Sequence, residues 1–267
     1  MTIRIIIAGP RGKMGQEAVN MVLKNKEFQL VGCIDRKNNG KKLTDISSLP
    51  NSDVPIFEDP EECMHTVHPD VLIDLTTPYA GFEHTLIALK SHVRAVVGTS
   101  GFSEQQIAEL QALAAENKTG CIIAPNFAIG AVLMMQFSKL AARYLPDVEI
   151  IEKHHDQKLD APSGTAIKTA ELIKEARNNK QQGHPDEVEL IPGARGAADD
   201  GIHIHSVRLP GLVAHQEVMF GGSGQILTIK HDSHHRESFM DGIRLSVEHV
   251  MNLEQLVYGL ENILNLD

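Results

Sequence analysis

Two adjacent histidines and a lysine, His154, His155 and Lys158, lie at the centre of the segment 148–166, which reads VEIIEKHHDQKLDAPSGTA. Histidine can deliver a proton near neutral pH because its unperturbed pKa is about 6.5. Lysine adds a positive charge and can also act as an acid. These residue types, so close together, predict a site that binds an anionic substrate and protonates it. The alternative is a loop whose cations are solvated.

A helix start follows these cations. Ser163 precedes a predicted helix over 166–177, in which apolar residues recur at helical spacing. As N-cap, its hydroxyl can accept a backbone hydrogen bond, and the amides of Gly164 and Thr165 are then available to an anion. The run 148–151 before the histidines has the β-branched residues typical of a strand. The alternative here is an ordinary helix cap without a ligand.

A glycine-rich turn lies near the other end of the sequence. It joins a predicted buried strand, Arg4–Ala8, to a predicted helix, Gln16–Lys24, and its residues are Gly9, Pro10, Arg11, Gly12, Lys13, Met14 and Gly15. A strand, a glycine turn and a helix are the setting in which dinucleotides bind. Asp35 ends the next strand, about 20 residues after the last glycine, where a carboxylate can accept hydrogen bonds from ribose hydroxyls.

The turn departs from the usual dinucleotide pattern at one position. Pro10 occupies a place where glycine is expected, with Gly9 just before it. Because proline fixes its own φ near about −65°, the turn cannot have the ordinary shape. Gly12 and Gly15 keep the roles of close approach to the ligand and of helix packing. A glycine turn without a ligand remains the alternative.

The charges around Asp35 bear on which nucleotide is used. The carboxylate favours NADH, because it accepts ribose hydroxyls and repels a 2′-phosphate. Arg36 and Lys37 follow at once, and Arg11 and Lys13 lie in the glycine turn, so cations are at hand to neutralise that phosphate. The sequence therefore predicts use of both NADH and NADPH. The alternative is that Arg36 and Lys37 face solvent.

The next part of the sequence repeats the order of strand and helix. Apolar strands over 71–75, 95–97 and 121–124 each lead into a polar turn, and Ser103 with Gln106 forms a capping box for a helix that ends near Asn117. Repeated β-then-α units predict a parallel, doubly wound sheet that binds ligands at the carboxyl ends of its strands. The further turns at that edge are Thr76–Pro78, then Gly98, Thr99 and Ser100, then Ala124, Pro125, Asn126 and Phe127.

After Phe127 the pattern changes. A helix over 130–144 is followed by the histidine segment and, later, by strand-like runs over 202–209, 213–220 and 225–231. We expect an α/β protein with a Rossmann-like domain, 1–127 and 236–267, and an α+β substrate and oligomerisation domain with a mixed sheet, 128–235. The polar segment 178–186 is predicted to be mobile, and 236–250 and 254–264 to be helices that cover the first sheet.

Composition excludes several classes of function. The formal charge of −10 argues against nonspecific binding to nucleic acid or to an anionic membrane. The start of the sequence has no signal-peptide pattern, and three scattered cysteines suit a reducing cytoplasm. Histidines are frequent after residue 200, but no cysteine or carboxylate cluster completes a metal site, so no metal is expected.

With these motifs in place, the chain resembles the 4-hydroxy-tetrahydrodipicolinate reductase (dihydrodipicolinate reductase) family along its whole length. The most specific motif is His154-His155-x-x-Lys158-x-Asp160-Ala-Pro-Ser-Gly-Thr-Ala166. It is supported by Gly9-x-x-Gly12-Lys-Met-Gly15, Gly98-Thr-Ser-Gly-Phe102, Ala124-Pro-Asn-Phe127, and Arg195-Gly196 with His203, Arg208 and Gly211.

The resemblance implies an NAD(P)H-dependent reductase of lysine and diaminopimelate biosynthesis that acts on a small dicarboxylate and forms homotetramers through its second domain. The general acid then falls on His154 and a second proton donor on Lys158. Substrate contacts fall on His155, Ser163, Gly164 and Thr165. Cofactor contacts fall on Gly9, Pro10, Arg11, Gly12, Lys13, Met14, Asp35, Arg36, Gly98, Thr99, Ser100, Ala124, Pro125, Asn126 and Phe127.

Two other functions compete with this one. Another two-domain dehydrogenase of a small acid would need a different catalytic group, such as a cysteine in a polar loop, and none of the three cysteines lies in one. A protein that only senses NAD(P) would not require His154, Lys158 and an anion-binding helix start together.

Overall fold

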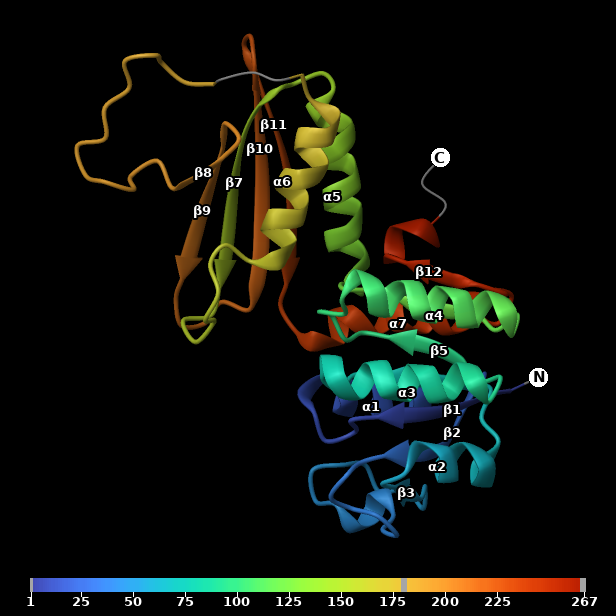
Figure 1. Ribbon diagram of the computed structural model, residues 1–267. Helices are drawn as coiled ribbons and strands as arrows, with labels where there is room; N and C mark the ends of the chain where they lie inside the picture. Colours follow the sequence, from blue (N-terminus) through green and yellow to red (C-terminus); the bar gives the residue numbers. More distant parts are fainter. Residues whose placement is uncertain (1, 179–181, 265–267) are drawn as a thin grey trace. The chain divides into compact units, whose positions relative to one another are not determined.

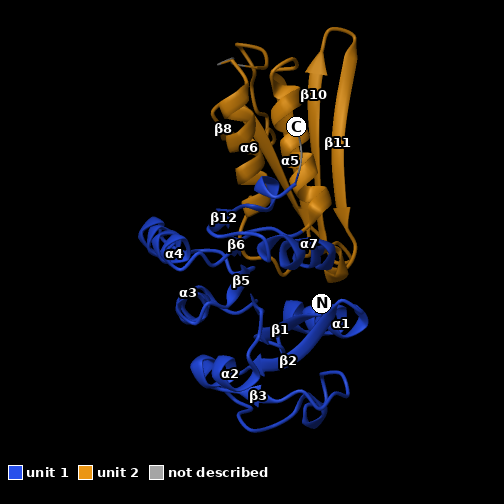
Figure 2. Ribbon diagram, turned by 90° about the vertical axis from the view of Figure 1, so that its right-hand side faces the viewer, with its two compact units in different colours: residues 1–127, 239–267 blue, residues 128–238 orange. Residues whose placement is uncertain are grey.

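The computed structural model describes residues 2–178 and 182–264. These form two compact units, unit 1 with residues 1–127 and 239–267, and unit 2 with residues 128–238 (Figure 2). The chain returns to unit 1 at Phe239, the last residue of a 3₁₀ helix, Arg236–Phe239, and three residues after the predicted boundary at Arg236.

Unit 1 contains a parallel sheet with the strand order β12-β6-β5-β4-β1-β2-β3 (Figure 1). The central strands are continuous apolar runs, as strands covered on both faces must be. The doubly wound parallel sheet is therefore confirmed. The strands are β1 Ile3–Ala8, β2 Phe28–Ile34, β3 Ile56–Phe57, β4 Val71–Asp74, β5 Arg94–Val97, β6 Cys121–Ile123 and β12 Leu256–Tyr258.

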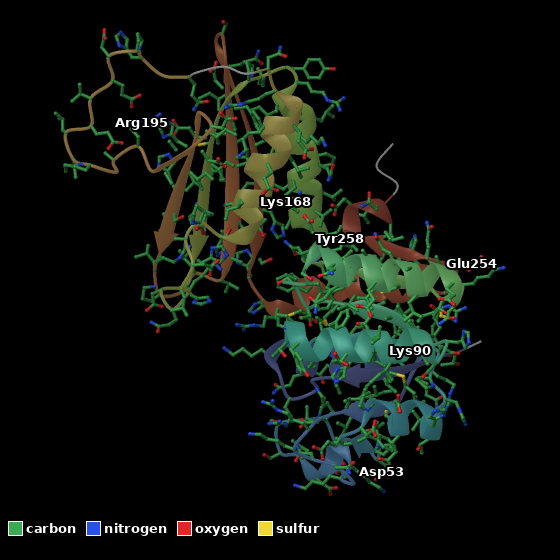
Figure 3. All side chains as sticks on the ribbon, in the orientation of Figure 1. Asp53, Lys90, Lys168, Arg195, Glu254 and Tyr258 are labelled. Atoms are coloured by element: carbon green, nitrogen blue, oxygen red, sulfur yellow. The ribbon has the colours of Figure 1, made fainter. Side chains whose placement is uncertain are left out.

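Helices cover both faces of this sheet. One face carries α2 Pro60–Val67, α3 Pro78–Lys90 and α4 Glu104–Glu116, and the other carries α1 Lys13–Lys24 and α7 Met240–Val250 (Figure 1). The predicted capping box is present at the start of α4, where the Ser103 hydroxyl accepts from the Gln106 amide at 3.2 Å. Charged side chains such as Lys90 on α3 remain exposed (Figure 3).

The predicted helix over 254–264 is wrong. In its place β12 pairs in parallel with β6 at the edge of the sheet, and a 3₁₀ helix, Leu260–Asn262, follows. Val257 and Tyr258 suit a strand. Gly259, at φ 92°, has a backbone conformation that no helix accepts. The helical spacing of the apolar residues was therefore overridden by pairing with a strand more than a hundred residues away.

Unit 2 has a five-stranded mixed sheet with the order β11-β10-β7-β9-β8, in which β7 runs parallel to β9 and antiparallel to β10. This confirms the predicted mixed sheet. Helices α5 Ile129–Ala142 and α6 Gly164–Ala176 pack on it. The strands are β7 Asp147–His154, β8 Ala197–Asp199, β9 Ile202–Arg208, β10 Ala214–Gly222 and β11 Gln225–Ser233.

Strand β7 continues to His154, beyond the run 148–151 predicted from β-branched residues. Its side chains alternate, and Val148, Ile150 and Glu152 are buried. Successive side chains point to opposite faces, so His154 shares the face of Glu152. The strand thus places an imidazole two residues beyond a buried carboxylate.

The polar segment 178–186 contains residues 179–181, which lie outside the described residues, and its predicted mobility stays a prediction. Among the helices of residues 2–178 and 182–264, none is long and apolar enough to cross a membrane.

Candidate active site

The predicted nucleotide turns of unit 1 meet at one edge of its sheet. Gly9 follows β1, Asp35 follows β2, Gly98 follows β5 and Ala124 follows β6, and these strands are parallel. Their carboxyl ends therefore lie side by side, at the edge where open α/β sheets bind ligands. Ser100 and Pro125 are exposed there, and Asn126 is half-buried.

The glycine turn is shaped by close backbone contacts. Gly9 has φ 81°, and its carbonyl accepts a hydrogen bond from the Gly12 amide at 3.1 Å. Gly12 is the N-cap of α1, so the first amides of that helix, including those of Lys13 and Met14, lie at the ligand edge. A Cβ added to Gly15 would lie 2.0 Å from the Gly9 carbonyl oxygen. The turn can hold a proline at position 10 because the residue that adopts a positive φ is Gly9, which has no Cβ, and not Pro10.

Arg11 and Asp35 form an ion pair across this edge. The Arg11 guanidinium donates to both oxygens of the Asp35 carboxylate, with Nη2 3.0 Å from Oδ1, and the Lys37 amide donates to Oδ1 at 2.9 Å. Burial raises the pKa of Asp35, but these hydrogen bonds outweigh burial and hold the pKa below its ordinary value. Asp35 is thus a carboxylate partly shielded by a cation, while Arg36 is exposed beside it.

A second carboxylate at the same edge was not predicted as a site residue. Asp74 ends β4, is fully buried and accepts hydrogen bonds from the hydroxyls of Thr76 at 2.7 Å and Thr99 at 3.1 Å. The ring of His84 on α3 lies 2.7 Å from its other oxygen. One side chain therefore ties the turn after β4 to the turn after β5. In the sequence, the position of Asp74 at the end of an otherwise apolar strand could have indicated a site residue.

The turn after β5 is packed closely as well. A Cβ on Gly98 would lie 2.7 Å from a Leu75 methyl carbon and 2.9 Å from the Phe127 ring. Phe127 from the turn after β6 therefore contacts the turn after β5 and leaves room for no side chain there.

In unit 2, several hydrogen bonds converge on Glu152, whose side chain is fully buried. The His154 ring lies with Nδ1 2.5 Å from Oε2. Arg208 on β9 donates Nη1 to Oε2 at 2.8 Å and Nη2 to Oε1 at 2.7 Å. The Ser163 amide donates to Oε1 at 3.2 Å. Sequence reasoning missed Glu152, although its spacing of two from His154 on a strand was a signal.

These contacts determine the protonation states of Glu152 and His154. Burial raises the pKa of Glu152, but hydrogen bonds from Arg208, Ser206 and His154 outweigh burial and hold its pKa below the ordinary value. Burial lowers the pKa of His154, and the hydrogen bond to Glu152 raises it only in part. The positive charges of Lys158 and Arg208 lower it further.

Lys158 lies on the loop between β7 and α6. Its Nζ is 2.7 and 2.8 Å from the two oxygens of Asp160, and Arg208 Nη2 donates to the Asp160 carbonyl at 2.8 Å. The Lys158 hydrogen bond holds the pKa of Asp160 below its ordinary value. The Lys158 amide donates to the His155 carbonyl at 3.2 Å, which closes a turn after the two histidines.

The helix start predicted at Ser163 is confirmed. The Ser163 hydroxyl accepts from the Ala166 amide at 3.2 Å, and α6 begins at Gly164. Gly164 is exposed, and an added Cβ would meet no described atom within 4 Å. The first turn of α6 thus opens to solvent next to the cations, as an anion site requires.

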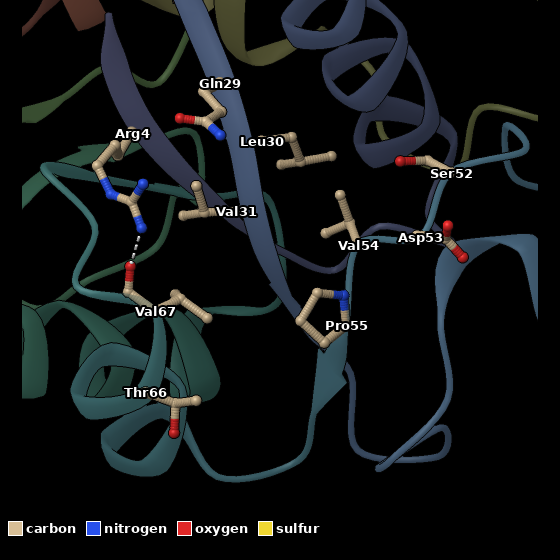
Figure 4. Close-up of a pocket in the computed structure, with 10 residues that line it drawn as sticks. All are labelled: Arg4, Gln29, Leu30, Val31, Ser52, Asp53, Val54, Pro55, Thr66 and Val67. Atoms are coloured by element: carbon tan, nitrogen blue, oxygen red, sulfur yellow. Dashed lines mark hydrogen bonds between the residues drawn. The ribbon is translucent and has the colours of Figure 1, made fainter.

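Other candidate sites lie elsewhere. A hollow of about 430 Å³ opens at the amino ends of β1 and β2, where Arg4 donates to the Val67 carbonyl at 2.6 Å (Figure 4). It lies at the edge opposite the glycine turn.

Cys33, Cys63 and Cys121 are buried free thiols, and burial raises the pKa of Cys63 and of Cys121 to about 12. Over the described ranges no group of His, Cys, Asp and Glu side chains is arranged to hold a metal ion.

A parallel sheet with a glycine turn, followed by a mixed-sheet unit that carries paired histidines and a lysine, defines a two-domain, nicotinamide-nucleotide-dependent oxidoreductase. Two family models match the chain, "Dihydrodipicolinate reductase, N-terminus" over residues 3–127 and "Dihydrodipicolinate reductase, C-terminus" over residues 130–264. The chain belongs to the dihydrodipicolinate reductase family.

Individual relatives agree with the family models. The chain is 59% identical to 4-hydroxy-tetrahydrodipicolinate reductases of Bacillus cereus and Bacillus thuringiensis, over 98% of this chain and 99% of each relative. It also resembles the solved structure of a dipicolinate-bound dihydrodipicolinate reductase from Paenisporosarcina sp. TG-14. That match has a TM-score of 0.92 and 58% identity, and it covers 99% of this chain and 100% of the other.

Proposed function

We propose that this protein reduces 4-hydroxy-tetrahydrodipicolinate to tetrahydrodipicolinate in lysine and diaminopimelate biosynthesis, with NADH or NADPH as reductant. The observation that carries the proposal is the group of His154, Lys158 and Arg208 beside the open start of α6. The relatives named 4-hydroxy-tetrahydrodipicolinate reductase, and the dipicolinate bound to the solved relative, support this substrate class.

Unit 2 has the groups needed to bind a dicarboxylate. The amides of Gly164 and Thr165, with Ser163 as cap, bind one carboxylate at the positive end of α6. His155 and the Lys158 ammonium bind the other anionic group, and the ammonium exchanges its contact with Asp160 for the substrate. Two such anchors fix the orientation of a rigid ring, which supplies much of the rate of a reaction at one carbon.

The proton comes from His154. Its Nδ1 bonds Glu152, so Nε2 is the nitrogen that delivers the proton, and Lys158 is the second donor. Burial lowers the pKa of His154 in the unliganded site. A bound dicarboxylate adds negative charge, which raises this pKa and favours the protonated ring when it is needed.

The residues at the edge of unit 1 fit a nicotinamide nucleotide. The α1 start at Gly12–Met14 is an anion site for the pyrophosphate, and Asp35 accepts ribose hydroxyls. A Cβ added at Gly12 would have only the Gly9 carbonyl oxygen nearby, at 3.4 Å, so the absence of a side chain there allows close approach of a ligand to the backbone. The other residues assigned to this site are Pro10, Arg11, Lys13, Arg36, Thr99, Ser100, Ala124, Pro125, Asn126 and Phe127. When bound, the nucleotide supplies the hydride.

Both nucleotides should be used, with kcat/KM values within about tenfold of each other, or about 1.4 kcal/mol. Asp35 suits NADH, and Arg11 and Arg36 beside it suit the 2′-phosphate of NADPH. Arg11→Ala unmasks the Asp35 charge and Arg36→Ala removes a phosphate partner, so each should weaken NADPH more than NADH. Steady-state kinetics with both nucleotides measure this. A preference above a hundredfold in the parent would contradict dual use.

Asp74→Asn should weaken NADH binding about tenfold, because an amide cannot accept from both threonine hydroxyls and the His84 ring as the carboxylate does. The two turns after β4 and β5 would then lose their common partner. Fluorescence titration with NADH measures the Kd. Asp70→Asn is the matched control, since Asp70 bonds the Arg4 amide at the amino end of the same sheet. An equal loss in both variants would make Asp74 a stability residue only.

The deciding assay follows NAD(P)H consumption with the freshly generated condensation product of pyruvate and aspartate semialdehyde. Turnover supports the proposed function. Turnover only with other small acids would favour another dehydrogenase, and nucleotide binding without turnover would favour an NAD(P)-sensing protein.

Assembly and location are part of the proposal. The open face of the unit 2 sheet carries Met219 and the exposed Ile226, and this face is where a homotetramer would form. Light scattering after gel filtration should give four times the 29.3 kDa chain mass. Free thiols at Cys33, Cys63 and Cys121 and dependence on a reduced nucleotide support action in the cytoplasm.

A further inference from the structure

We propose that Glu152 is the positioning residue of the reaction: its carboxylate fixes the His154 ring, the Arg208 guanidinium and the start of α6 in one arrangement, so that Nε2 of His154 points its proton at the substrate. This inference rests on the proposed function, in which His154 is the general acid. It assigns a role to a residue that contacts no substrate and acts through three others.

The acceptor capacity of Glu152 is fully used. Oε1 accepts from the Ser163 amide and Arg208 Nη2, and Oε2 accepts from Arg208 Nη1 and His154 Nδ1. A carboxylate offers about four lone-pair positions, and these bonds together with the one from Ser206 occupy them, which holds the carboxylate in place. These donors come from β7, β9 and the N-cap of α6, and Arg208 on β9 is 56 residues away from Glu152 in the sequence.

The charge of Glu152 decides which nitrogen of His154 carries hydrogen. A buried carboxylate can only accept, so the ring must present Nδ1–H to it, and Nε2 remains for the substrate. The two-residue spacing on β7 places the ring and the carboxylate on one face, 2.5 Å apart. Without the carboxylate the ring could turn or adopt the other tautomer, and the proton on Nε2 would no longer point toward the substrate.

The charges around His154 give this role a measurable consequence. Glu152 on its own strand raises the pKa of His154, whereas Lys158 on the loop and Arg208 on β9 lower it. Glu152→Gln removes the raising charge and leaves both lowering charges. The pKa of His154 must then fall, and a general acid with a lower pKa is lost at a lower pH as the pH rises.

The experiment compares Glu152→Gln with Glu149→Gln. Glu149 is on the same strand and also bonds an arginine, Arg195 at 2.5 Å, and a histidine, His205 at 2.8 Å, but on the other face of the sheet (Arg195 in Figure 3). The control therefore loses the same kinds of bond away from the site. The readouts are the pH profile of kcat and an NMR titration of the His154 ring, whose ¹⁵N shifts also report the tautomer.

We expect Glu152→Gln to move the alkaline limb of kcat and the NMR midpoint of His154 down by about one pH unit, with kcat at neutral pH falling about tenfold. NADH affinity should stay unchanged, and Glu149→Gln should match the parent in both profiles. If Glu152→Gln does not fold, Glu152→Asp keeps the charge but withdraws it by one methylene, and should show a smaller shift in the same direction.

An NMR midpoint and tautomer of His154 unchanged in Glu152→Gln would overturn the proposal, as would a shifted midpoint with an unshifted kcat profile. The NMR titration needs no turnover, so it tests whether Glu152 controls the pKa and the tautomer of His154 even if the parent fails to reduce the dicarboxylate. That failure would count against the proposed function alone.

Discussion

His154→Gln should lower kcat by about 10²–10⁴-fold, because the variant lacks the general acid that protonates the substrate as hydride arrives. Glutamine has nearly the reach of the imidazole and can still donate to Glu152, so the bonds among Glu152, Arg208 and Ser163 should persist. The Kd of NADH should stay within about twofold, since the predicted nucleotide site belongs to unit 1. Steady-state kinetics and nucleotide titration measure the two quantities.

The matched control for this variant is His205→Gln. His205 also bonds a glutamate of β7, Glu149 at 2.8 Å, but on the face of the sheet that lacks the site. The control removes an equivalent histidine–carboxylate pair and should keep kcat within about twofold. If His154→Gln also keeps kcat, its ring is structural and the proton must come from Lys158 or His155.

Gly15→Ala should weaken NADH binding at least about 30-fold, or about 2 kcal/mol, and should lower the melting temperature as well. The added Cβ would lie 2.0 Å from the Gly9 carbonyl oxygen and 3.0 Å from the Pro10 Cα. Both atoms are backbone, so the glycine turn itself must move away from α1. Calorimetry or fluorescence titration gives the Kd, and thermal unfolding gives the change in stability.

Gly12→Ala tests close approach to the ligand separately from helix packing, the two roles of the glycines in this turn. At Gly12 the added Cβ would be 3.4 Å from the Gly9 carbonyl oxygen, an ordinary contact, and φ of −66° suits alanine. Stability should therefore change by less than about 0.5 kcal/mol, while NADH binding weakens because the methyl group meets the pyrophosphate. Unaltered NADH binding in Gly12→Ala would mean that the nucleotide does not approach this part of the turn.

The local features of both units could be predicted from the sequence, because they depend on neighbours along the chain. The glycine turn lies between an apolar strand and an amphipathic helix, and the capping residues Ser103 and Ser163 bond amides three residues away. Asp35 stands where β2 ends, since a buried apolar run can be read directly. These patterns sufficed for the parallel sheet and the mixed sheet.

Only the tertiary structure decided which distant residues complete the site. Arg208 reaches Glu152 because β7 and β9 pair with His154 opposite Arg208, a register that no local pattern specifies. In the same way Asp74 meets Thr99 only because β4 and β5 are neighbours, and 256–258 became a strand because the edge of β6 was there to pair with. Hydrogen bonds between segments depend on strand order and register, which are properties of the whole sheet. The sequence around Asp74 and Glu152 therefore could not show which distant groups these buried carboxylates would bond.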